Sequence, residues 1–352
     1  MALSPEGLIS DYWHLVAHRS ELAEPGDFVR LDWAPGELVL HNDAGEIIAF
    51  DNICPHRGGR FFVENRGNAR AICPYHGWAV RGGEVRPARR EQFTACDLER
   101  AVLRRYRSQW CGDFLFVGIE PIMSLERQLD AFMGPLAEIS GDIVGVRDVY
   151  PIDFQADWRV GLENALEGYH VNSVHPQTLA PMALCEDQDS FAGMNSAYHA
   201  RVGDGRTRRG LEGLRRFFDL RAPFEGYSAY YVFPFAMVSS TYGYSYAVQT
   251  YFPSGTPNRS RFCTRLYASR AAPGAEGVSE TLLNAAVRFN RQVFDEDHAI
   301  CARVSPRYDL DGETRIFASS EARVRFLAET LRRIEAAQAA SAAPHQRWNM
   351  AR

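Results

Sequence analysis

Two short stretches of this chain each combine a cysteine and a histidine in nearly the same setting. CPHRGG contributes Cys54 and His56, and CPYHGW contributes Cys73 and His76 after sixteen intervening residues. Thiolates and neutral imidazoles are ligands of both iron–sulfur clusters and zinc. Two loops of this kind could therefore bring two thiolates and two imidazoles to one metal centre.

The distribution of the four side chains favours a [2Fe–2S] cluster over zinc. Zinc sites favour two cysteines in one loop and two histidines in another, whereas here each loop supplies one of each. Replacing two cluster thiolates by histidines raises the reduction potential to roughly −150 to +300 mV, which suits a one-electron relay. Gly58, Gly59 and Gly77 would let backbone N–H groups approach the sulfurs, and Pro55 and Pro74 would stiffen the loops.

A second group of potential ligands lies in the segment WRVGLENALEGYHVNSVHP. Asn164, Glu167 and His170 are three residues apart, which predicts that they share one face of a helix. His175 stands directly before Pro176, so we expect the helix to end there and His175 to turn back beside His170. Two histidines and one carboxylate on one face of a metal form the facial triad of Fe(II) oxygenases, with positions open for O2 and substrate.

The carboxylate of such a triad must come from another part of the chain. The predicted helix VFDEDHAICARV offers Asp295, Glu296 and Asp297. Taken singly, acids of this kind indicate a solvated helix end, and a lone histidine indicates a structural group. On a chain that already carries the paired cysteine–histidine loops, the combination indicates a mononuclear iron site.

Both groups of residues resemble those of one family, the catalytic (alpha) subunits of Rieske-type non-haem iron oxygenases. The cysteine–histidine loops are similar to those of the Rieske domain, and this resemblance covers about residues 12–118. Residues 164–175 match the family motif N-x-x-(D/E)-x-Y-H-x4-H. The resemblance implies that His170, His175 and Asp297 bind the mononuclear Fe(II), with Asp295 as the alternative third ligand.

The resemblance also implies catalytic roles for Glu167 and Asn164 beside the iron. Glu167 stands three residues before His170, close enough to accept a hydrogen bond from its second ring nitrogen. In the family this position bridges to a cluster histidine of a neighbouring subunit, here His76, so a ring-shaped homotrimer is expected. The usual residue there is Asp, and Glu recurs in the branch that resembles choline, betaine and carnitine oxygenases, although not only there.

The activity that the resemblance implies is hydroxylation (mono- or dioxygenation) or oxidative dealkylation of a small organic substrate, aromatic or quaternary-ammonium, with O2 as co-substrate. Electrons would come from NAD(P)H through a separate reductase, with or without a ferredoxin, because the chain has no G-x-G-x-x-G or other nicotinamide or flavin signature. The alternative is an electron-transfer or redox-sensing protein, which would tolerate loss of the triad residues.

The elements that must position these residues form two parts. Before about residue 119, short runs of Val, Leu, Phe and Trp are broken by Gly, Pro, Asn and Asp, which is typical of a small antiparallel β domain. Residues 227–267 are rich in aromatic and β-branched residues, which predicts long strands. Helical spacing predicts helices at residues 124–139, 157–171, 279–304 and 320–337.

We therefore predict an α+β protein with two domains. Residues 1–119 would form an N-terminal segment and a Rieske [2Fe–2S] antiparallel β domain. By resemblance, residues 120–340 would form a helix-grip-like catalytic domain whose curved antiparallel sheet packs on a long helix. Residues 341–352 are expected to form a flexible tail.

The bulk properties limit the partners. The chain has 352 residues with a formal net charge of −5, so it has no basic field for nucleic acid or an anionic membrane. Its first residues, MALSPEGLISDYWHLV, lack the pattern of a secretory signal, and no stretch approaches 18 apolar residues. We expect a cytoplasmic protein. Five cysteines without framework spacing argue against a disulfide scaffold: Cys96, Cys111, Cys185, Cys263 and Cys301.

Two further sets of residues were considered as site candidates. Seven aromatic residues of the predicted strands could line a pocket or cage a quaternary ammonium group, although core packing is the simpler expectation for most: Tyr230, Phe233, Phe235, Tyr242, Tyr244, Tyr246 and Tyr251. Five histidines without partners at ligand spacing are expected to be structural or surface groups: His14, His18, His41, His199 and His345.

Overall fold

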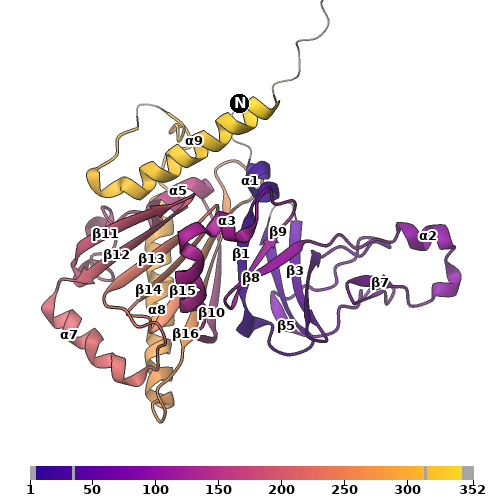
Figure 1. The fold of residues 1–352 in the computed structure, drawn as a ribbon, viewed down its shortest axis with the longest axis horizontal. Helices are drawn as coiled ribbons and strands as arrows, with labels where there is room; N and C mark the ends of the chain where they lie inside the picture. Colours follow the sequence, from indigo (N-terminus) through magenta and orange to yellow (C-terminus); the bar gives the residue numbers. More distant parts are fainter. Residues whose placement is uncertain (1–4, 34–35, 313–314, 343–352) are drawn as a thin grey trace, which may run out of the picture.

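The computed structural model describes residues 5–33, 36–312 and 315–342. Small sheets from the first part of the chain lie at one end of the molecule, and a large sheet with most of the helices lies at the other (Figure 1). No helix in the described ranges is long and apolar enough to cross a membrane.

The first part contains three small antiparallel sheets. Their strand orders are β4-β3-β2-β5, β1-β9-β8 and the hairpin β6-β7. The strands are β1 (Trp13–His18), β2 (Asp27–Trp33), β3 (Gly36–Asp43), β4 (Glu46–Asp51), β5 (Arg66–Asn68), β6 (Ala79–Arg81), β7 (Glu84–Arg86), β8 (Arg107–Cys111) and β9 (Phe114–Gly118). Phe28, Val39 and Phe50 of this part form a buried cluster with Cys54 and Cys73, so the core of the domain anchors both cysteine–histidine loops.

The second part is built on one seven-stranded antiparallel sheet of order β10-β16-β15-β14-β13-β12-β11. Its strands are β10 (Ile143–Phe154), β11 (Leu184–Ala192), β12 (Asn195–Val202), β13 (Tyr227–Val232), β14 (Ala236–Thr241), β15 (Ser245–Pro253) and β16 (Ser260–Ser269). Strands β11 to β16 follow one another along the chain, and β10 pairs with β16 at the far edge. The aromatic and β-branched residues of β13–β16 are largely buried, as their composition predicts.

A 26-residue helix, α8 (Glu276–Cys301), packs along this sheet (Figure 1). Phe294 of α8 lies against Phe262 of β16, with ring centroids 4.9 Å apart. The predicted α+β class, with an antiparallel sheet packed on a long helix, is confirmed. This packing fixes the position of the acidic residues in the last turns of α8.

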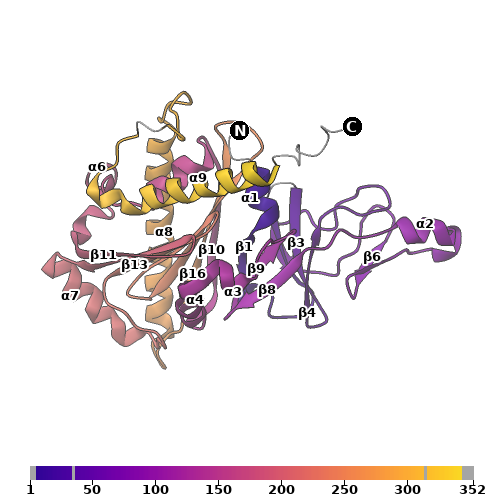
Figure 2. The same ribbon diagram turned by 45° about the horizontal axis from the view of Figure 1, so that its top comes forward.

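Most of the remaining helices lie around the large sheet and the junction between the two parts, whereas the helix of residues 95–100 lies at the outer end of the first part (Figure 1). The α-helices are α1 (Pro5–Asp11), α2 (Ala95–Arg100), α3 (Leu125–Leu129), α4 (Met133–Ser140), α5 (Trp158–Ala165), α6 (Val171–Val174), α7 (Gly205–Leu214) and α9 (Ala322–Ala342). Short 3-10 turns are η1 (Arg19–Glu21), η2 (Arg90–Gln92), η3 (Asp130–Phe132), η4 (Ala180–Met182), η5 (Arg215–Phe217) and η6 (Ser319–Glu321). Helix α9 crosses beside β11, β12 and β13 (Figures 1 and 2).

Some elements differ from the sequence-based expectations. The helix expected at 124–139 is interrupted at Asp130, which has φ +52°, because the Asn195 side chain binds the carbonyl of Gln128 there at 2.6 Å. Strands β10 to β12 were not predicted, since edge strand β11 is polar and exposed along most of its length. Helix α9 extends to Ala342, so the first two residues of the expected tail are helical, and residues 343–352 lie outside the described ranges.

The change in sequence character near residue 119 falls between β9 and α3. One buried hydrophobic cluster joins residues from both sides of it, including Val16 and Leu31 on one side and Phe235 and Phe262 on the other. The two parts therefore share a core. The division at residue 119 stays a prediction.

Candidate active site

The two cysteine–histidine loops have the same backbone conformation. The Gly58 N–H donates to the Cys54 carbonyl and the Gly77 N–H donates to the Cys73 carbonyl, both at 2.9 Å. Gly58 and Gly77 have φ values of +71° and +72°, a left-handed conformation that glycine adopts without strain. A Cβ atom at Gly59 would lie 2.8 Å from the Cys73 sulfur, so only glycine leaves room beside that thiol.

The loops bring like ligands together in pairs. The His56 and His76 rings lie 4.5 Å apart between centroids, and the Cys54 and Cys73 side chains are buried side by side. Burial raises the pKa of the Cys54 thiol, and the neighbouring Cys73 thiol raises it as well. His56 stacks on Trp78 at 4.8 Å, and its Nδ1 atom is buried with no hydrogen-bond partner among the described residues. His76, in contrast, is exposed.

This donor set fits a [2Fe–2S] cluster rather than a single zinc ion. Two sulfurs on one side and two imidazoles on the other match one iron bound by thiolates and one bound by histidines. A single ion needs ligand atoms that converge on one point. In the part of the chain that the structure describes, the loop side chains form no such compact group.

A second constellation is built from the segment between α5 and Pro176. Asn164 lies on α5, whereas Glu167 and His170 lie in the turn between α5 and α6. The expectation of one continuous helix face is therefore wrong. The Glu167 carboxylate instead closes the turn by accepting the backbone N–H groups of Tyr169 and, at 3.2 Å, His170. The positions of these three side chains are therefore determined by a short helix and the turn after it, and not by the repeat of one continuous helix.

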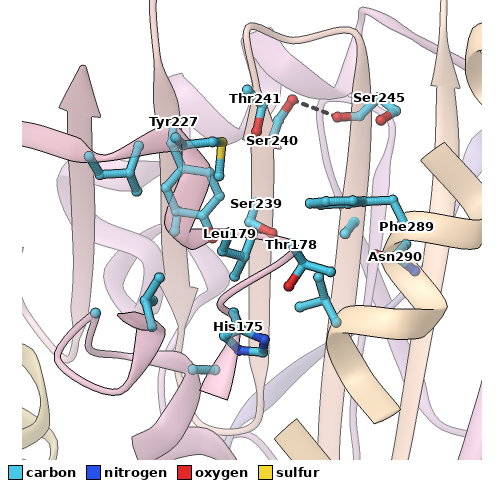
Figure 3. A pocket seen from close by; sticks show the side chains of 18 of the residues that line it. His175, Thr178, Leu179, Tyr227, Ser239, Ser240, Thr241, Ser245, Phe289 and Asn290 are labelled. Atoms are coloured by element: carbon cyan, nitrogen blue, oxygen red, sulfur yellow. Dashed lines mark hydrogen bonds between the residues drawn. The ribbon is translucent and has the colours of Figure 1, made fainter. Parts of the chain in front are cut away.

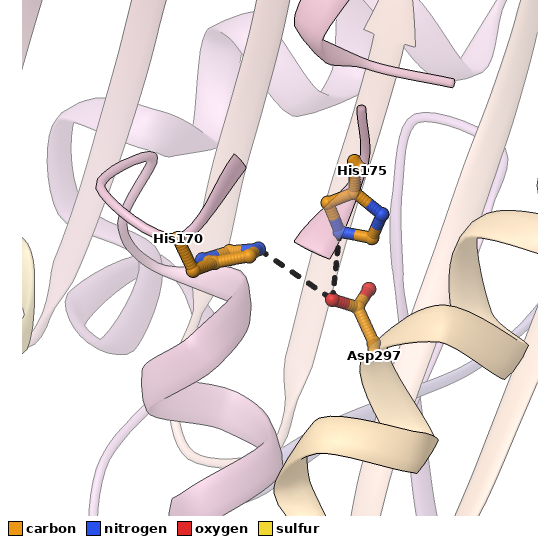
Figure 4. Close-up of side chains that lie close together, drawn as sticks. All are labelled: His170, His175 and Asp297. Atoms are coloured by element: carbon orange, nitrogen blue, oxygen red, sulfur yellow. Dashed lines mark hydrogen bonds and ion pairs between the residues drawn. The ribbon is translucent and has the colours of Figure 1, made fainter. Parts of the chain in front are cut away.

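His170 and His175 nevertheless come together as predicted, with ring centroids 5.2 Å apart. Asp297 reaches them from α8: its Oδ1 atom lies 2.9 Å from His175 Nε2 and 3.5 Å from His170 Nε2 (Figure 4). Asn164 Nδ2 donates to the same oxygen at 2.7 Å. The ligand atoms of the two histidines and Asp297 lie within 4.8 Å of one another, which is compact enough to hold one metal ion.

The three neighbouring acids of α8 point in different directions. Asp295 is exposed and accepts a hydrogen bond from the Tyr150 hydroxyl at 2.7 Å. Glu296 accepts from His175 Nδ1 at 2.7 Å, so it orients the imidazole from behind. Asp297 alone of the three faces both histidines. The geometry thus favours Asp297 over Asp295 as the third metal ligand. It also gives Glu296 a role in orienting His175, which sequence spacing did not single out.

Glu167 plays the corresponding part for the other histidine. Its Oε1 atom lies 2.5 Å from His170 Nδ1. Burial lowers the pKa of His170, but Asp297 and Glu167 outweigh this effect and raise it to about 9. The two histidines likewise hold the pKa of the Asp297 carboxyl below its usual range, although burial opposes them. The charge of the Asp297 and Glu167 carboxylates that raises the pKa of His170 would also favour a metal cation at this site.

These residues border a cavity of about 610 Å³ between the sheet and α8. His175 lies at one end of the view in Figure 3, with Tyr227 of β13 and Phe289 of α8 on opposite sides and Ser239 between them. Most of the surface that lines the cavity is apolar. Such a cavity is of the size and character of small-molecule sites.

The aromatic side chains at the cavity are mostly not those expected. Of the seven candidates, Tyr244 borders it, five others are buried in the core, and Tyr230 is partly buried against that core. The aromatic residues that border it besides Tyr244 are Tyr198, Phe218, Tyr227, Phe289 and Phe294. The sequence could not separate the two sets, because alternation along a strand does not say which face meets a cavity when both faces are buried.

The histidines and cysteines outside both motifs are not among the proposed metal ligands. His14, His18 and His41 are buried and bond to backbone carbonyl oxygens, and His199 is exposed. His345 lies outside the described residues. All seven cysteines are free of disulfides.

Loops with paired thiols and imidazoles, on a domain joined to a sheet-and-helix domain with a two-histidine, one-carboxylate group, define the class of Rieske-type non-haem iron oxygenase subunits. Comparison with protein-family models agrees. Residues 12–96 match the Rieske [2Fe–2S] domain, and residues 143–336 match the ring hydroxylating alpha subunit (catalytic domain). The chain belongs to this alpha-subunit family, and the resemblance noted in the sequence is confirmed.

Individual relatives extend this result. The glycine betaine monooxygenase oxygenase subunit of Chromohalobacter salexigens is 29% identical over 192 residues, 53% of this chain and 43% of the relative. The carnitine monooxygenase oxygenase subunit of Escherichia coli (strain K12) is 30% identical over 179 residues, 49% of this chain and 48% of the relative. The chain thus spans about half the length of the curated relatives it matches.

The fold has close counterparts among solved structures. A quaternary ammonium Rieske monooxygenase in complex with L-carnitine superposes with a TM-score of 0.73 at 19% identity, covering 93% of this chain and 90% of that one. This likeness establishes the shared fold. It includes both the Rieske part and the catalytic part of the chain.

Proposed function

We propose that this chain is the oxygenase component of a multicomponent enzyme that uses O2 to hydroxylate, or oxidatively dealkylate, a small organic substrate. The observation that carries the proposal is that His170, His175 and Asp297 converge at the wall of an apolar cavity. An electron carrier or a redox sensor would need neither feature.

In this proposal His170, His175 and Asp297 hold the mononuclear iron. Bound Fe(II) supplies open coordination positions at which O2 is activated. Glu167 and Glu296 each accept the Nδ1–H of one histidine, which leaves both Nε2 lone pairs directed toward Asp297. The proposed ligands thus keep one orientation while a substrate enters from the cavity side.

Asn164 holds the third ligand. Its amide donates to Asp297 Oδ1 at 2.7 Å, which fixes the carboxylate oxygen that faces both histidines. A hydrogen bond to a charged carboxylate is stronger than one to a neutral oxygen, so losing it would loosen the position of the Asp297 carboxylate.

We propose that Cys54, His56, Cys73 and His76 bind the Rieske cluster and that electrons leave it through His76. Within one chain, β6, which directly follows the second loop, and α6 lie toward opposite ends of the molecule (Figure 2). His76 is exposed, as a residue that meets a neighbouring subunit should be.

A ring-shaped homotrimer would bring His76 of one subunit to Glu167 of the next. Glu167 already bonds His170, so it would complete a bridge between the two metal centres. The proposed partners are a reductase that draws on NAD(P)H, with or without a ferredoxin, and the proposed location is the cytoplasm.

The proposed substrate is a small aromatic or quaternary-ammonium compound. The names of the relatives, glycine betaine and carnitine monooxygenases, support the second class. Aromatic side chains at the cavity wall, such as Tyr198 and Tyr227, could contact either an aromatic ring or a quaternary ammonium group.

The test is reconstitution of the purified protein with a reductase and NADH under 18O2, with candidate substrates screened by O2 and reductant consumption. The proposal predicts substrate-dependent consumption and 18O in the product, or release of an aldehyde after dealkylation. Consumption that never depends on a substrate, in protein with both metal centres loaded, would contradict it.

A further inference from the structure

Arg323 carries a buried positive charge that forms no ion pair with any described residue. The residue is 3% exposed and lies in the first turn of α9. Its Nε–H donates to Ser196 Oγ at 3.1 Å, whereas its Nη2 atom is buried without an acceptor in the described ranges. Within those ranges it forms no ion pair.

Other buried arginines of the same protein are paired. Arg315 binds the carboxylate of Glu163 at 2.5 Å, and Arg265 lies 3.5 Å from that of Glu21. A buried guanidinium without a counter-charge is costly, because neither water nor an anion replaces the lost hydration. The exception at Arg323 therefore calls for an anion that is present in the working protein.

The charge stays on Arg323 at neutral pH. Burial lowers the pKa of its guanidinium, to about 10, although Asp189 and nearby tyrosines oppose this effect. Asp189 of edge strand β11, the acid that acts on it most, borders the same cavity but is exposed and makes no ion pair with Arg323.

Arg323 borders the same cavity as the iron-site residues. Tyr227, which also borders the cavity, lies within electrostatic range of both Arg323 and Asp297. Figure 3 shows Tyr227 on the cavity wall, and Tyr198 borders the cavity beside Arg323. A molecule in the cavity therefore has the guanidinium and the histidines on the walls around it.

We propose that Arg323 binds a carboxylate of the substrate and so directs the opposite, oxidisable end of that molecule to His170, His175 and Asp297. This inference rests on the proposed function and narrows its substrate to small organic carboxylates, including zwitterions. The planar guanidinium can bind a carboxylate through two parallel hydrogen bonds. Among the described residues that line the cavity there is no second Arg or Lys, which matches one negative charge better than the two of a phosphate ester.

The test compares acids with their uncharged amides on the protein loaded with both metal centres, under anaerobic conditions. The probes are acetate, benzoate and glycine betaine, each against its primary amide, measured by calorimetry. The variants are Arg323→Gln, Arg323→Lys and, as a matched control, Arg325→Gln, which alters an exposed arginine two residues away on the same helix.

For at least one pair we expect the acid to bind wild-type protein more tightly than its amide. In Arg323→Gln, the affinity for the acid should fall by at least about thirtyfold, while the affinity for the amide should stay nearly unchanged. Arg323→Lys should retain part of the preference, and Arg325→Gln all of it. Equal binding of acid and amide, no acid binding, or acid binding that survives in Arg323→Gln would overturn the inference.

A ligand-free measurement separates binding from structure. If Arg323 is kept for a ligand, Arg323→Met should melt at the same or a higher temperature than wild type, because an unpaired buried charge is removed. A clear fall in melting temperature would assign Arg323 to the fold and overturn the inference. Iron content and turnover report on the oxygenase proposal separately, since carboxylate binding at Arg323 does not require either.

Discussion

The Oε1 atom of Glu167 lies 2.5 Å from Nδ1 of His170, and the opposite nitrogen of the same ring faces Asp297 at 3.5 Å. Glu167 also accepts backbone N–H groups of the turn that carries His170. One carboxylate therefore fixes both the backbone and the ring of a proposed iron ligand. It does so from a turn next to exposed residues, where a neighbouring subunit can reach it.

This relationship predicts the effect of replacing Glu167 with Gln. The amide is nearly the same size but replaces a charged acceptor with a neutral one, so both the orientation of His170 and the proposed bridge to His76 weaken. We expect turnover to fall by about tenfold to a hundredfold, while the spectrum of the [2Fe–2S] cluster stays unchanged. Steady-state kinetics and iron analysis check this, and Glu167→Asp should recover part of the activity. Unaltered turnover in Glu167→Gln would show that electrons do not pass from His76 to His170 through Glu167.

The paired loops predict the colour of the protein. Purified protein should be brown, and reduction should give the electron paramagnetic signal of mixed histidine and cysteine ligation. Cys54→Ser and His76→Ala should lose both, because each removes one of four proposed cluster ligands. Circular dichroism should show that the variants stay folded, since the loops lie outside the seven-stranded sheet. A colourless wild-type protein with one zinc would contradict the cluster.

Much of this site could be read from the sequence because the signals were local. Each loop needs a cysteine, a histidine and a left-handed glycine at fixed spacing, and the structure has these at Gly58 and Gly77. In the same way, the match of residues 164–175 to a known motif identified His170 and His175 as candidate iron ligands. Local motifs of this kind do not depend on knowing how the chain folds between them.

The contributions that sequence missed depend on tertiary packing. The family resemblance implied Asp297, but the hydrogen bond from His175 to the neighbouring Glu296 depends on how α8 is rotated against the sheet. Arg323 is remote in sequence from every motif, and nothing in its surroundings along the chain marks it as buried. Its proposed role in binding a carboxylate follows from its place at the cavity wall.

Buried histidines away from the site predict how stability changes with pH. Burial lowers the pKa of His14 from 6.5 to about 4, so the folded state favours its neutral form. Its contribution is fully present above pH 6.5 and is lost as pH falls toward 4, because the unfolded chain binds the proton first. By pH 5 the loss should be about 2 kcal/mol. His14→Gln should flatten the dependence of unfolding free energy on pH over this range, measured with denaturant, and parallel curves would contradict the assignment.

Transfer of electrons between subunits predicts complementation of two inactive variants. His76→Ala lacks a working cluster and Asp297→Ala lacks the proposed iron ligand. Dissociated and reassembled together, they should recover activity, because about a quarter of random interfaces in a ring join an intact cluster to an intact iron site. Each variant reassembled alone is the control. Verified mixed rings without activity would exclude a route from His76 of one subunit to Glu167 of the next.

The most direct test of the two-centre account is the iron and acid-labile sulfide content of three proteins. Wild type should contain three irons and two sulfides per chain, since a [2Fe–2S] cluster and one further iron are proposed. Asp297→Ala should lose one iron and keep both sulfides, whereas the neighbouring Asp295→Ala, whose carboxylate bonds Tyr150, should match wild type. Two irons in the wild-type protein after anaerobic loading with Fe(II), or three in Asp297→Ala, would contradict the account.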